Sequence, residues 1–404
     1  MESLFARRTA WNLARNRYTE ALDAQRRSGR ELLDLTASNP TTVGLQYREE
    51  ILLRALSSRD ALRYQPEARG LLPARAAVAE YYREHGCEVS TDDLFLTTST
   101  SEAYSFIFRL LCDPGDALLA PTPGYPLFDF LADLQDVKLV PYELVYDQGW
   151  QVEPAALFAA VDRALAAGAR PRAILAVHPN NPTGSYLDGR ELQLMNDVCA
   201  THEMAIVADE VFLDYSLGSD RPFTFAANEE VLTFSLSGLS KISALPQMKV
   251  AWIAVNGPPA WKQDAWERLE VIADTYLSMN SPVQFAAPTL LEERRHIQPQ
   301  LLARIRANLQ ELDTQLASQS LCRRLEVEGG WYAVLRIPAI GSDEEFAISL
   351  LQRTGVLVQP GHFYDFAADG YLVISLITQP ELFQPGLARL LKHVATTAGG
   401  TSSL

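Results

Sequence analysis

Polar side chains that could do chemistry come directly after several short apolar runs. Asp209 follows the run 204–208, and Lys241 comes soon after the run 231–236. A carboxylate at the end of an apolar strand is costly unless it has a partner, although Asp is also favoured as a residue that caps a helix. A lysine amine can act as a nucleophile or carry a proton. The two residues therefore indicate a reaction site, although most lysines lie on the surface.

Two turn-rich segments follow other apolar runs. Asn181 lies in residues 178–184, which read HPNNPTG, and Tyr125 lies in residues 121–126, which read PTPGYP. Alone, an Asn-Pro pair is typical of a turn, and a lone tyrosine more often belongs to a core. Their shared position after apolar runs makes both residues candidates for a ligand site.

The elements that must position these residues are strands that alternate with helices. The run 94–97, for example, is followed by a helix expected over 101–112. Runs that are apolar throughout indicate strands buried on both faces, which predicts an α/β fold with a mainly parallel sheet and helices on both faces. Ligands of such sheets bind beyond the carboxyl ends of the strands. Because the candidate residues follow strand ends, we expect them to share one site.

Three parts of the chain are expected. Residues 1–47 are predicted to form an N-terminal arm and part of a small domain, and residues 48–287 to form a large domain. Residues 288–404 are predicted to form a linking helix, over about 288–318, and then a smaller α+β domain. A strand-like segment at 325–338, broken by a Gly-Gly pair, opens that domain.

Composition disfavours several kinds of partner. The formal charge of −15 comes from 35 basic and 50 acidic residues, which disfavours nucleic acid but is compatible with a local pocket for one phosphate. No run of about 18 apolar residues predicts a membrane span, and residues 1–30 lack the apolar stretch of a signal peptide. The four cysteines are far apart and lack metal-ligand spacing, so we expect a cytoplasmic protein without a metal site.

Several motifs occur in an order that resembles a known family. HPNNPTG at 178–184, Asp-Glu at 209–210 and SGLSK at 237–241, followed by Lys249, resemble the class I/II aminotransferases among the fold-type I pyridoxal-phosphate enzymes. The resemblance extends over about residues 34–390. It implies pyridoxal 5'-phosphate as cofactor, bound in the large domain. It also implies a ping-pong exchange of an amino group between an amino acid or amine and a 2-oxo acid, in a homodimer.

The resemblance implies a role for each of the four candidate residues. Lys241 would hold the cofactor as a Schiff base and move the proton between the substrate α-carbon and the cofactor. Asp209 would pair with the protonated pyridine nitrogen and keep the ring cationic. Asn181 would hydrogen-bond the phenolic oxygen of the ring and contact substrate, and Tyr125 would stack on the ring.

The cofactor phosphate is expected to bind hydroxyl groups at the start of a helix, where free backbone N–H groups favour an anion, and further groups close to Lys241. These residues are Ser99, Thr100, Ser101, Ser237, Ser240 and Lys249. Tyr64 resembles the tyrosine that reaches the phosphate of the neighbouring subunit, which implies at least a dimer.

Three departures from the family pattern concern the cofactor and the backbone beside the substrate. Phe212 stands where a tyrosine usually contacts the phenolic oxygen, and so lacks a hydrogen bond that normally lowers the Schiff-base pKa. Lys249 replaces an arginine, which removes a planar, two-pronged donor. Ser38 replaces a glycine that often precedes Asn-Pro, where the backbone meets substrate.

The fourth departure concerns the substrate. Val373 stands where the family usually has an arginine that binds the substrate α-carboxylate, and valine cannot bind a carboxylate. Either another cation, such as Arg336 or Arg69, holds that group, or the substrate has no carboxylate there. His362 and Tyr364 are polar candidates near the same pocket.

One alternative to an aminotransferase stays open, and a second is disfavoured. A lyase or decarboxylase could use the same cofactor and fold, because fold does not determine reaction type, and the absent arginine favours it. A regulatory protein of this fold would carry a helix-turn-helix domain. About 30 residues before the fold begins and a charge of −15 leave no room for that domain.

Overall fold

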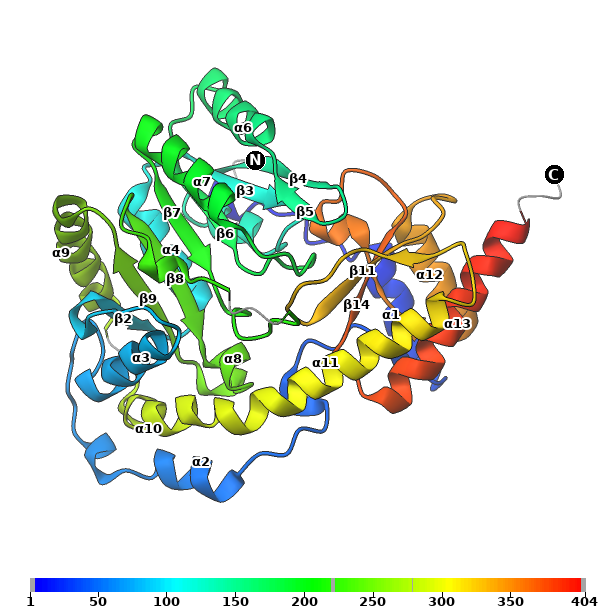
Figure 1. Cartoon of the computed structure of the whole chain (residues 1–404), viewed down its shortest axis with the longest axis horizontal. Coiled ribbons are helices and arrows are strands. Elements are labelled where there is room, and N and C mark those ends of the chain that lie inside the picture. Colours follow the sequence, from blue (N-terminus) through cyan, green and yellow to red (C-terminus); the bar gives the residue numbers. More distant parts are fainter. Residues whose placement is uncertain (1–3, 219–221, 278, 401–404) are drawn as a thin grey trace.

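The structure is a computed structural model that describes residues 4–218, 222–277 and 279–400. A large α/β domain and a smaller domain lie side by side, at the left and right of Figure 1. The long helix α11 (Arg294–Leu316) runs from one to the other along the lower side of this view.

Within the described residues, the sheet of the large domain has eight strands in the order β2-β9-β8-β7-β6-β3-β4-β5. These are β2 (Leu94–Thr97), β3 (Ala117–Thr122), β4 (Lys138–Tyr146), β5 (Trp150–Val152), β6 (Pro171–Val177), β7 (Ala205–Asp209), β8 (Thr233–Gly238) and β9 (Ala251–Asn256). The block from β8 to β4 is parallel, whereas β9 is antiparallel to β2 and β8, and β5 is antiparallel to β4. The predicted mainly parallel sheet is confirmed.

Helices cover both faces of this sheet. They are α2 (Glu49–Leu56), α3 (Leu72–Glu84), α4 (Thr100–Leu111), α5 (Phe128–Asp133), α6 (Pro154–Ala166), α7 (Gly189–His202), α8 (Leu239–Ile242), α9 (Pro259–Thr275) and α10 (Ser281–Glu292). Successive strand residues point to opposite faces. Leu175 and Val207 therefore pack with α4 and α9, while Ile174 and Ile206 pack with α6 and α7.

The smaller domain is built from both ends of the chain. Its antiparallel sheet has the order β10-β11-β14-β13 among the described residues, and β1 pairs in parallel with β12. Its elements are α1 (Arg17–Arg27), β1 (Leu33–Asp34), β10 (Arg323–Arg324), β11 (Tyr332–Arg336), α12 (Asp343–Thr354), β12 (Val356–Leu357), β13 (Gln359–Pro360), β14 (Tyr371–Ser375) and α13 (Pro380–Gly400). The Gly-Gly pair lies just before β11, so the strand begins after it.

The predicted linking helix differs from what the structure contains. A single helix starting near residue 288 was expected, but α10 begins at Ser281 and ends at Glu292, and α11 then starts at Arg294. Proline is most favourable in the first turn of a helix, which is why Pro288 resembled a helix start. It lies inside α10 instead, where the chain does without one helical N–H.

Two features of composition can be checked directly. Among the residues that the structure describes, no helix is long and apolar enough to cross a membrane. Cys87, Cys112, Cys199 and Cys322 are all free thiols.

A buried polar cluster holds the segments around the candidate lysine together. Asp214, which follows β7, lies 2.6 Å from Nε2 of His85 on α3. The side-chain amide of Gln298 on α11 donates both to Asp214, at 2.8 Å, and to the backbone oxygen of Ile242, at 3.0 Å. Ile242 is the residue after Lys241, so this cluster ties α8 to α3 and α11.

We expect replacement of Asp214 by Ala to lower the free energy of unfolding by about 3 kcal/mol, because it leaves the partly buried His85 and Gln298 without their shared acceptor. Urea unfolding at one fixed protein concentration measures the change. The matched control is Asp162→Ala on the exposed side of α6, which should change the value by less than about 0.5 kcal/mol. Equal effects of the two substitutions would contradict the role assigned to Asp214.

Candidate active site

Lys241 lies on α8, immediately after β8, at the junction of the two domains. Its Nζ is 4.8 Å from the ring centroid of Trp331, which precedes β11, and 5.5 Å from that of Phe212. Tyr215 donates a hydrogen bond of 2.6 Å to the backbone oxygen of Lys241. Burial lowers the pKa of Lys241 to about 8, and the charge of Asp209 opposes this shift. An appreciable fraction of this amine is therefore uncharged and nucleophilic near neutral pH.

Asp209 is the last residue of β7 and is buried. Its carboxylate accepts hydrogen bonds of 3.1 Å from the Tyr104 hydroxyl and from the backbone N–H of Val211. Burial raises the pKa of Asp209 to about 6, against the effect of these two bonds and of Lys241. Among the described residues it forms no salt bridge, so a cationic partner such as a protonated ring nitrogen fits beside it.

Asn181 and Asn180 have different surroundings in the turn after β6. The amide nitrogen of Asn180 donates to the backbone oxygen of Pro123 and to Thr183 Oγ1, both at 3.0 Å. Asn181 makes no side-chain hydrogen bond within the described residues, and the Oδ1 atoms of both Asn180 and Asn181 are buried without a partner there. A buried amide oxygen needs a donor, and a polar ring substituent of a bound ligand would meet that need.

Tyr125 follows β3 and lies between Asp209 and the smaller domain. Its pKa is raised by burial first and then by the negative charge of Asp209, which shows that the two groups are near one another. The ring packs edge-on against Phe128, with centroids 5.7 Å apart. Next to it, the backbone N–H of Gly124 donates to the backbone oxygen of Tyr364 at 3.0 Å. This bond connects the turn after β3 to the smaller domain.

The hydroxyl-rich segment 99–101 begins α4. Ser99 precedes the helix and accepts a 3.2 Å hydrogen bond from the backbone N–H of Glu102, while Thr100 and Ser101 form its first turn. The free N–H groups of that turn favour an anion such as a phosphate. The Glu102 carboxylate is held by Thr98, whose backbone N–H and hydroxyl donate to Oε2 at 2.6 and 3.0 Å.

The remaining sequence-predicted residues are placed as follows. Ser237 is buried and donates to the backbone oxygen of Glu210 at 3.3 Å. Ser240 is half-buried in α8, and Lys249 is exposed with a left-handed backbone, φ 54°. Ser38 follows Ala37, whose backbone oxygen accepts from Ser375 Oγ at the end of β14. Tyr64 is 75% exposed in the single chain.

Sequence reasoning did not single out the aromatic partner of Lys241 from the smaller domain. Trp331 is fully buried, and its ring centroid is 5.2 Å from that of Phe212. The available signal was the Gly-Gly pair directly before two aromatic residues. Glycine lets the backbone come close to a neighbouring segment, and the large side chains that follow can then reach it. Tyr104, the donor to Asp209, gave no signal because it reads as an ordinary core residue of α4.

Val373 lies in the middle of β14 and is fully buried in the core of the smaller domain. It pairs in register with Val334 on β11 and with Gln359 on β13. Valine offers no donor to a carboxylate, so the nearest polar group in this register is the amide of Gln359.

The two arginines considered as substitutes already have partners. Arg69 forms ion pairs with Asp92, at 3.2 Å, and Glu270, at 3.4 Å. Arg336 donates to the backbone oxygen of Asp369 at 2.6 Å, and its guanidinium carbon lies 4.2 Å from the centroid of the Tyr371 ring. Neither guanidinium is held ready for a substrate carboxylate.

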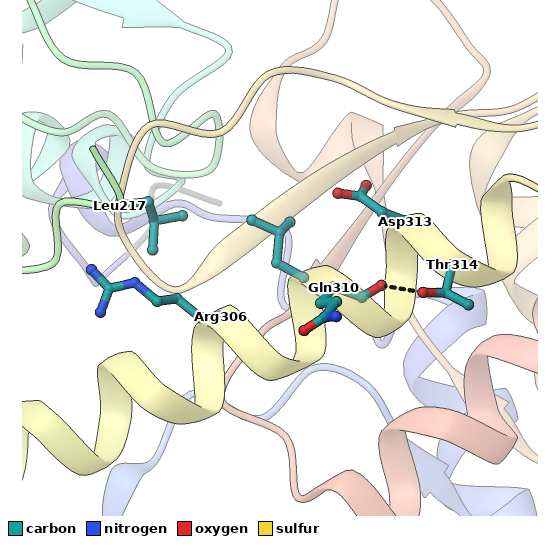
Figure 2. Close-up of a pocket in the computed structure, with 6 residues that line it drawn as sticks. Leu217, Arg306, Gln310, Asp313 and Thr314 are labelled. Carbon is teal, nitrogen blue, oxygen red and sulfur yellow. Dashed lines mark hydrogen bonds between the residues drawn. The ribbon is translucent and has the colours of Figure 1, made fainter. Parts of the chain in front are cut away.

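A separate hollow of about 530 Å³ lies along α11, away from these residues (Figure 2). Its lining residues are Leu217, Arg306, Leu309, Gln310, Asp313 and Thr314. The Asp313 carboxylate is bound by Arg324 at 2.7 Å, and the Thr314 hydroxyl bonds to the Gln310 backbone within the helix. The hollow therefore holds none of the groups that converge on Lys241.

Comparison with known proteins identifies relatives along nearly the whole chain. The pattern of the family described as aminotransferase class I and II matches residues 30–384. Glutamate-pyruvate aminotransferase AlaA of Haemophilus influenzae is 28% identical over 379 residues, which cover 90% of this chain and 91% of that protein. An alanine aminotransferase of Mycobacterium tuberculosis is 27% identical over 363 residues, which cover 87% of this chain and 82% of that protein.

A solved structure shares the fold. Alanine aminotransferase from Pyrococcus furiosus superposes with a TM-score of 0.86 at 21% identity, over 97% of this chain and 100% of that chain. At this identity the likeness concerns the fold, and it confirms the predicted α/β architecture with a second, smaller domain.

We expect Lys241 in the cofactor-free protein to be acylated with half-maximal rate near pH 8, because only the uncharged amine reacts and burial lowers its pKa to about 8. An unperturbed lysine would reach this point at about pH 10.4. Mass spectrometry of the peptide that contains Lys241 follows the reaction. Asp209→Asn removes the charge that raises this pKa, so its midpoint should fall at lower pH than that of the unsubstituted protein. A midpoint near pH 10 in either protein would contradict this site geometry.

Proposed function

The chain belongs to the aminotransferase class I and II family, and on this basis we propose that it transfers an amino group between an amino acid or amine and a 2-oxo acid on pyridoxal phosphate held by Lys241. The observation that carries the proposal is an amine and a carboxylate that follow or end neighbouring strands. Asp209 ends β7 with a buried carboxylate that forms no salt bridge among the described residues. Lys241 follows the adjacent strand β8, with its Nζ 4.8 Å from the Trp331 ring and its pKa lowered to about 8 by burial. An amine nucleophile and a group that stabilises a ring cation are the two requirements of this cofactor.

Each residue contributes one action. When bound, pyridoxal phosphate supplies an aldehyde carbon that accepts the amino group and a ring that draws electrons from the substrate α-carbon. Lys241 Nζ provides the nucleophile and then moves a proton to and from that carbon. Asp209 would hold a proton on the ring nitrogen, and the side-chain nitrogen of Asn181 would donate to the phenolic oxygen of the ring. Trp331 and Phe212 exclude water around the amine.

Phe212 alters how the lysine is tuned. A phenylalanine cannot donate to a ring oxygen, so the amine loses one interaction that would lower its pKa. Burial beside Phe212 and Trp331 lowers the same pKa by desolvation. In this chain, burial therefore lowers the pKa of Lys241 in place of the absent hydroxyl.

The phosphate of the cofactor is assigned to the start of α4 and to the segment that follows β8. The contributing residues are Ser99, Thr100, Ser101, Ser237, Ser240 and Lys249. Lys249 acts there as a point charge. Its exposed position in the chain leaves the ammonium free to approach the phosphate from solvent.

We further propose a cytoplasmic homodimer in which Tyr64 reaches the site of its partner. Apolar side chains around it face solvent in the single chain, with Leu62 89% and Leu53 64% exposed. Contiguous exposed apolar side chains are typical of protein interfaces. The free state of all four thiols supports a reducing compartment.

We expect Lys241→Ala to lower amino-group transfer by at least about 10³-fold, because it removes both the nucleophile and the proton carrier. Borohydride reduction followed by mass spectrometry should find the cofactor on the Lys241 peptide of the unsubstituted protein only. The control is Lys138→Ala, an exposed lysine of β4, which should leave both readouts unchanged. Unaltered activity and labelling in Lys241→Ala would sink the proposal.

The products decide between transfer and the lyase alternative. Transfer converts the cofactor absorbance to that of pyridoxamine phosphate and yields a 2-oxo product without ammonia. Elimination yields a keto acid with ammonia and returns the original spectrum. The relatives and the structure reported above are aminotransferases, so the first outcome is expected.

A mixing experiment tests the dimer. Lys241→Ala and Tyr64→Ala should each be weakly active alone. If Tyr64 serves the partner's site, a mixed dimer contains one site with both residues intact. Random exchange of equal amounts should then restore about a quarter of the unsubstituted activity. Activity that stays at the sum of the separate proteins would show that Tyr64 acts within its own chain or not at all.

A further inference from the structure

One face of the small sheet carries uncharged polar groups and borders Phe212, the residue whose ring lies beside Lys241. Tyr332 and Val334 share a face of β11, because alternate strand residues point the same way. The ring centroid of Tyr332 lies 6.3 Å from that of Phe212, which borders Lys241. Val373 on β14 pairs with Val334, and Gln359 on β13 pairs with Val373, so both residues lie on this same face of the sheet.

Gln359 is fixed by a neighbouring hydroxyl. Tyr364 donates to Gln359 Oε1, which orients the amide and leaves its nitrogen without a hydrogen-bond partner among the described residues. Tyr364 is itself held by the bond between its backbone oxygen and Gly124 N–H. The pKa of Tyr364 is raised by burial first and then by the nearby phenols of Tyr332, Tyr125 and Tyr18.

Among the residues that the structure describes, this face provides no available cation beside Val373. Arg336 lies two residues after Val334 on β11, but its guanidinium donates to the Asp369 backbone oxygen and lies over the Tyr371 ring. Phe366 stacks on Tyr371, with centroids 4.4 Å apart and planes inclined by 21°, which holds this arrangement in place. A substrate carboxylate brought here would lose its water without gaining a counter-charge, which is strongly unfavourable.

We propose that Gln359 and Tyr364 determine substrate specificity, and that the amino donor presents an uncharged hydrogen-bonding group, a carboxamide or a hydroxyl, where relatives with an arginine bind a carboxylate. The Gln359 amide nitrogen donates to the oxygen of that group, and the neighbouring tyrosine hydroxyls complete its hydrogen bonds. Site groups that must pair with a specific donor or acceptor discriminate strongly against a ligand that cannot match them. This inference rests on the proposed amino-group transfer.

The test compares L-alanine with L-alaninamide, which differ only in the carboxylate or carboxamide. Conversion of the cofactor absorbance in a single turnover is measured for the cofactor-loaded protein. We expect alaninamide to react at least about tenfold faster than alanine. Val373→Arg introduces a two-pronged donor for carboxylates, so it should move the ratio of the two rates toward alanine by about tenfold or more. Taking the ratio in each protein cancels the intrinsic reactivity of the two amines.

Gln359→Leu should lower the rate with alaninamide by about tenfold and leave the slow rate with alanine unchanged, since only the amide loses a hydrogen-bond partner. The matched control is Gln151→Leu on the exposed side of β5, which should alter neither rate. Thermal unfolding midpoints of each variant identify any loss of folding. Equal losses for both substrates in a folded Gln359→Leu protein would overturn the assignment.

Two further outcomes have distinct meanings. Faster reaction of alanine in the unsubstituted protein, abolished by Arg336→Gln, would show that Arg336 binds a carboxylate and would overturn the inference alone. Failure of every donor, together with cofactor labelling that persists in Lys241→Ala, would overturn the proposed function and this inference with it.

Discussion

The buried carboxylate of Asp209 at the end of β7 is the constraint on which the site depends. The parallel sheet brings β6, β7 and β8 to a common edge, so the polar residues that follow them lie close together. A carboxylate there must be compensated, and two neutral hydrogen bonds leave its pKa raised to about 6. The nearby amine of Lys241 supplies part of that compensation. A cationic ligand ring, as proposed above, would supply the rest.

Much of the large domain could be predicted because its strands are apolar on both faces and end at recognisable turns. The run before Asp209 and the turn that contains Asn181 are examples in which local sequence and global fold agree. The start of α10 was missed although the sequence signals it, because Asn280 caps the helix and Pro282 lies in its first turn. Element boundaries are set by tertiary contacts as much as by local preference.

The candidate site was predictable on the cofactor side and much less so on the substrate side. Lys241 and Asp209 are separated by few elements, and their order is informative. The partners of Arg336 could not be predicted, because its contacts with the Asp369 backbone oxygen and the Tyr371 ring depend on the pairing of β11 with β14. A sequence shows that Val373 is not a cation. Only the folded arrangement shows that the arginines proposed in its place are already engaged.

The origin of the smaller domain from both ends of the chain has a consequence for biosynthesis. β1 pairs with β12, and the Tyr18 hydroxyl bonds to the backbone oxygen of Val358, 340 residues later in the sequence. During synthesis, all strands of the large sheet leave the ribosome well before β12 and β14 are made. Domains generally fold as units during synthesis. The half of the site that holds Lys241 can therefore fold first, and it stays exposed to water until the smaller domain forms. Trp331 and the Gln359 face are made last, so a truncated nascent chain would lack the smaller-domain residues that lie beside Lys241 in the finished fold.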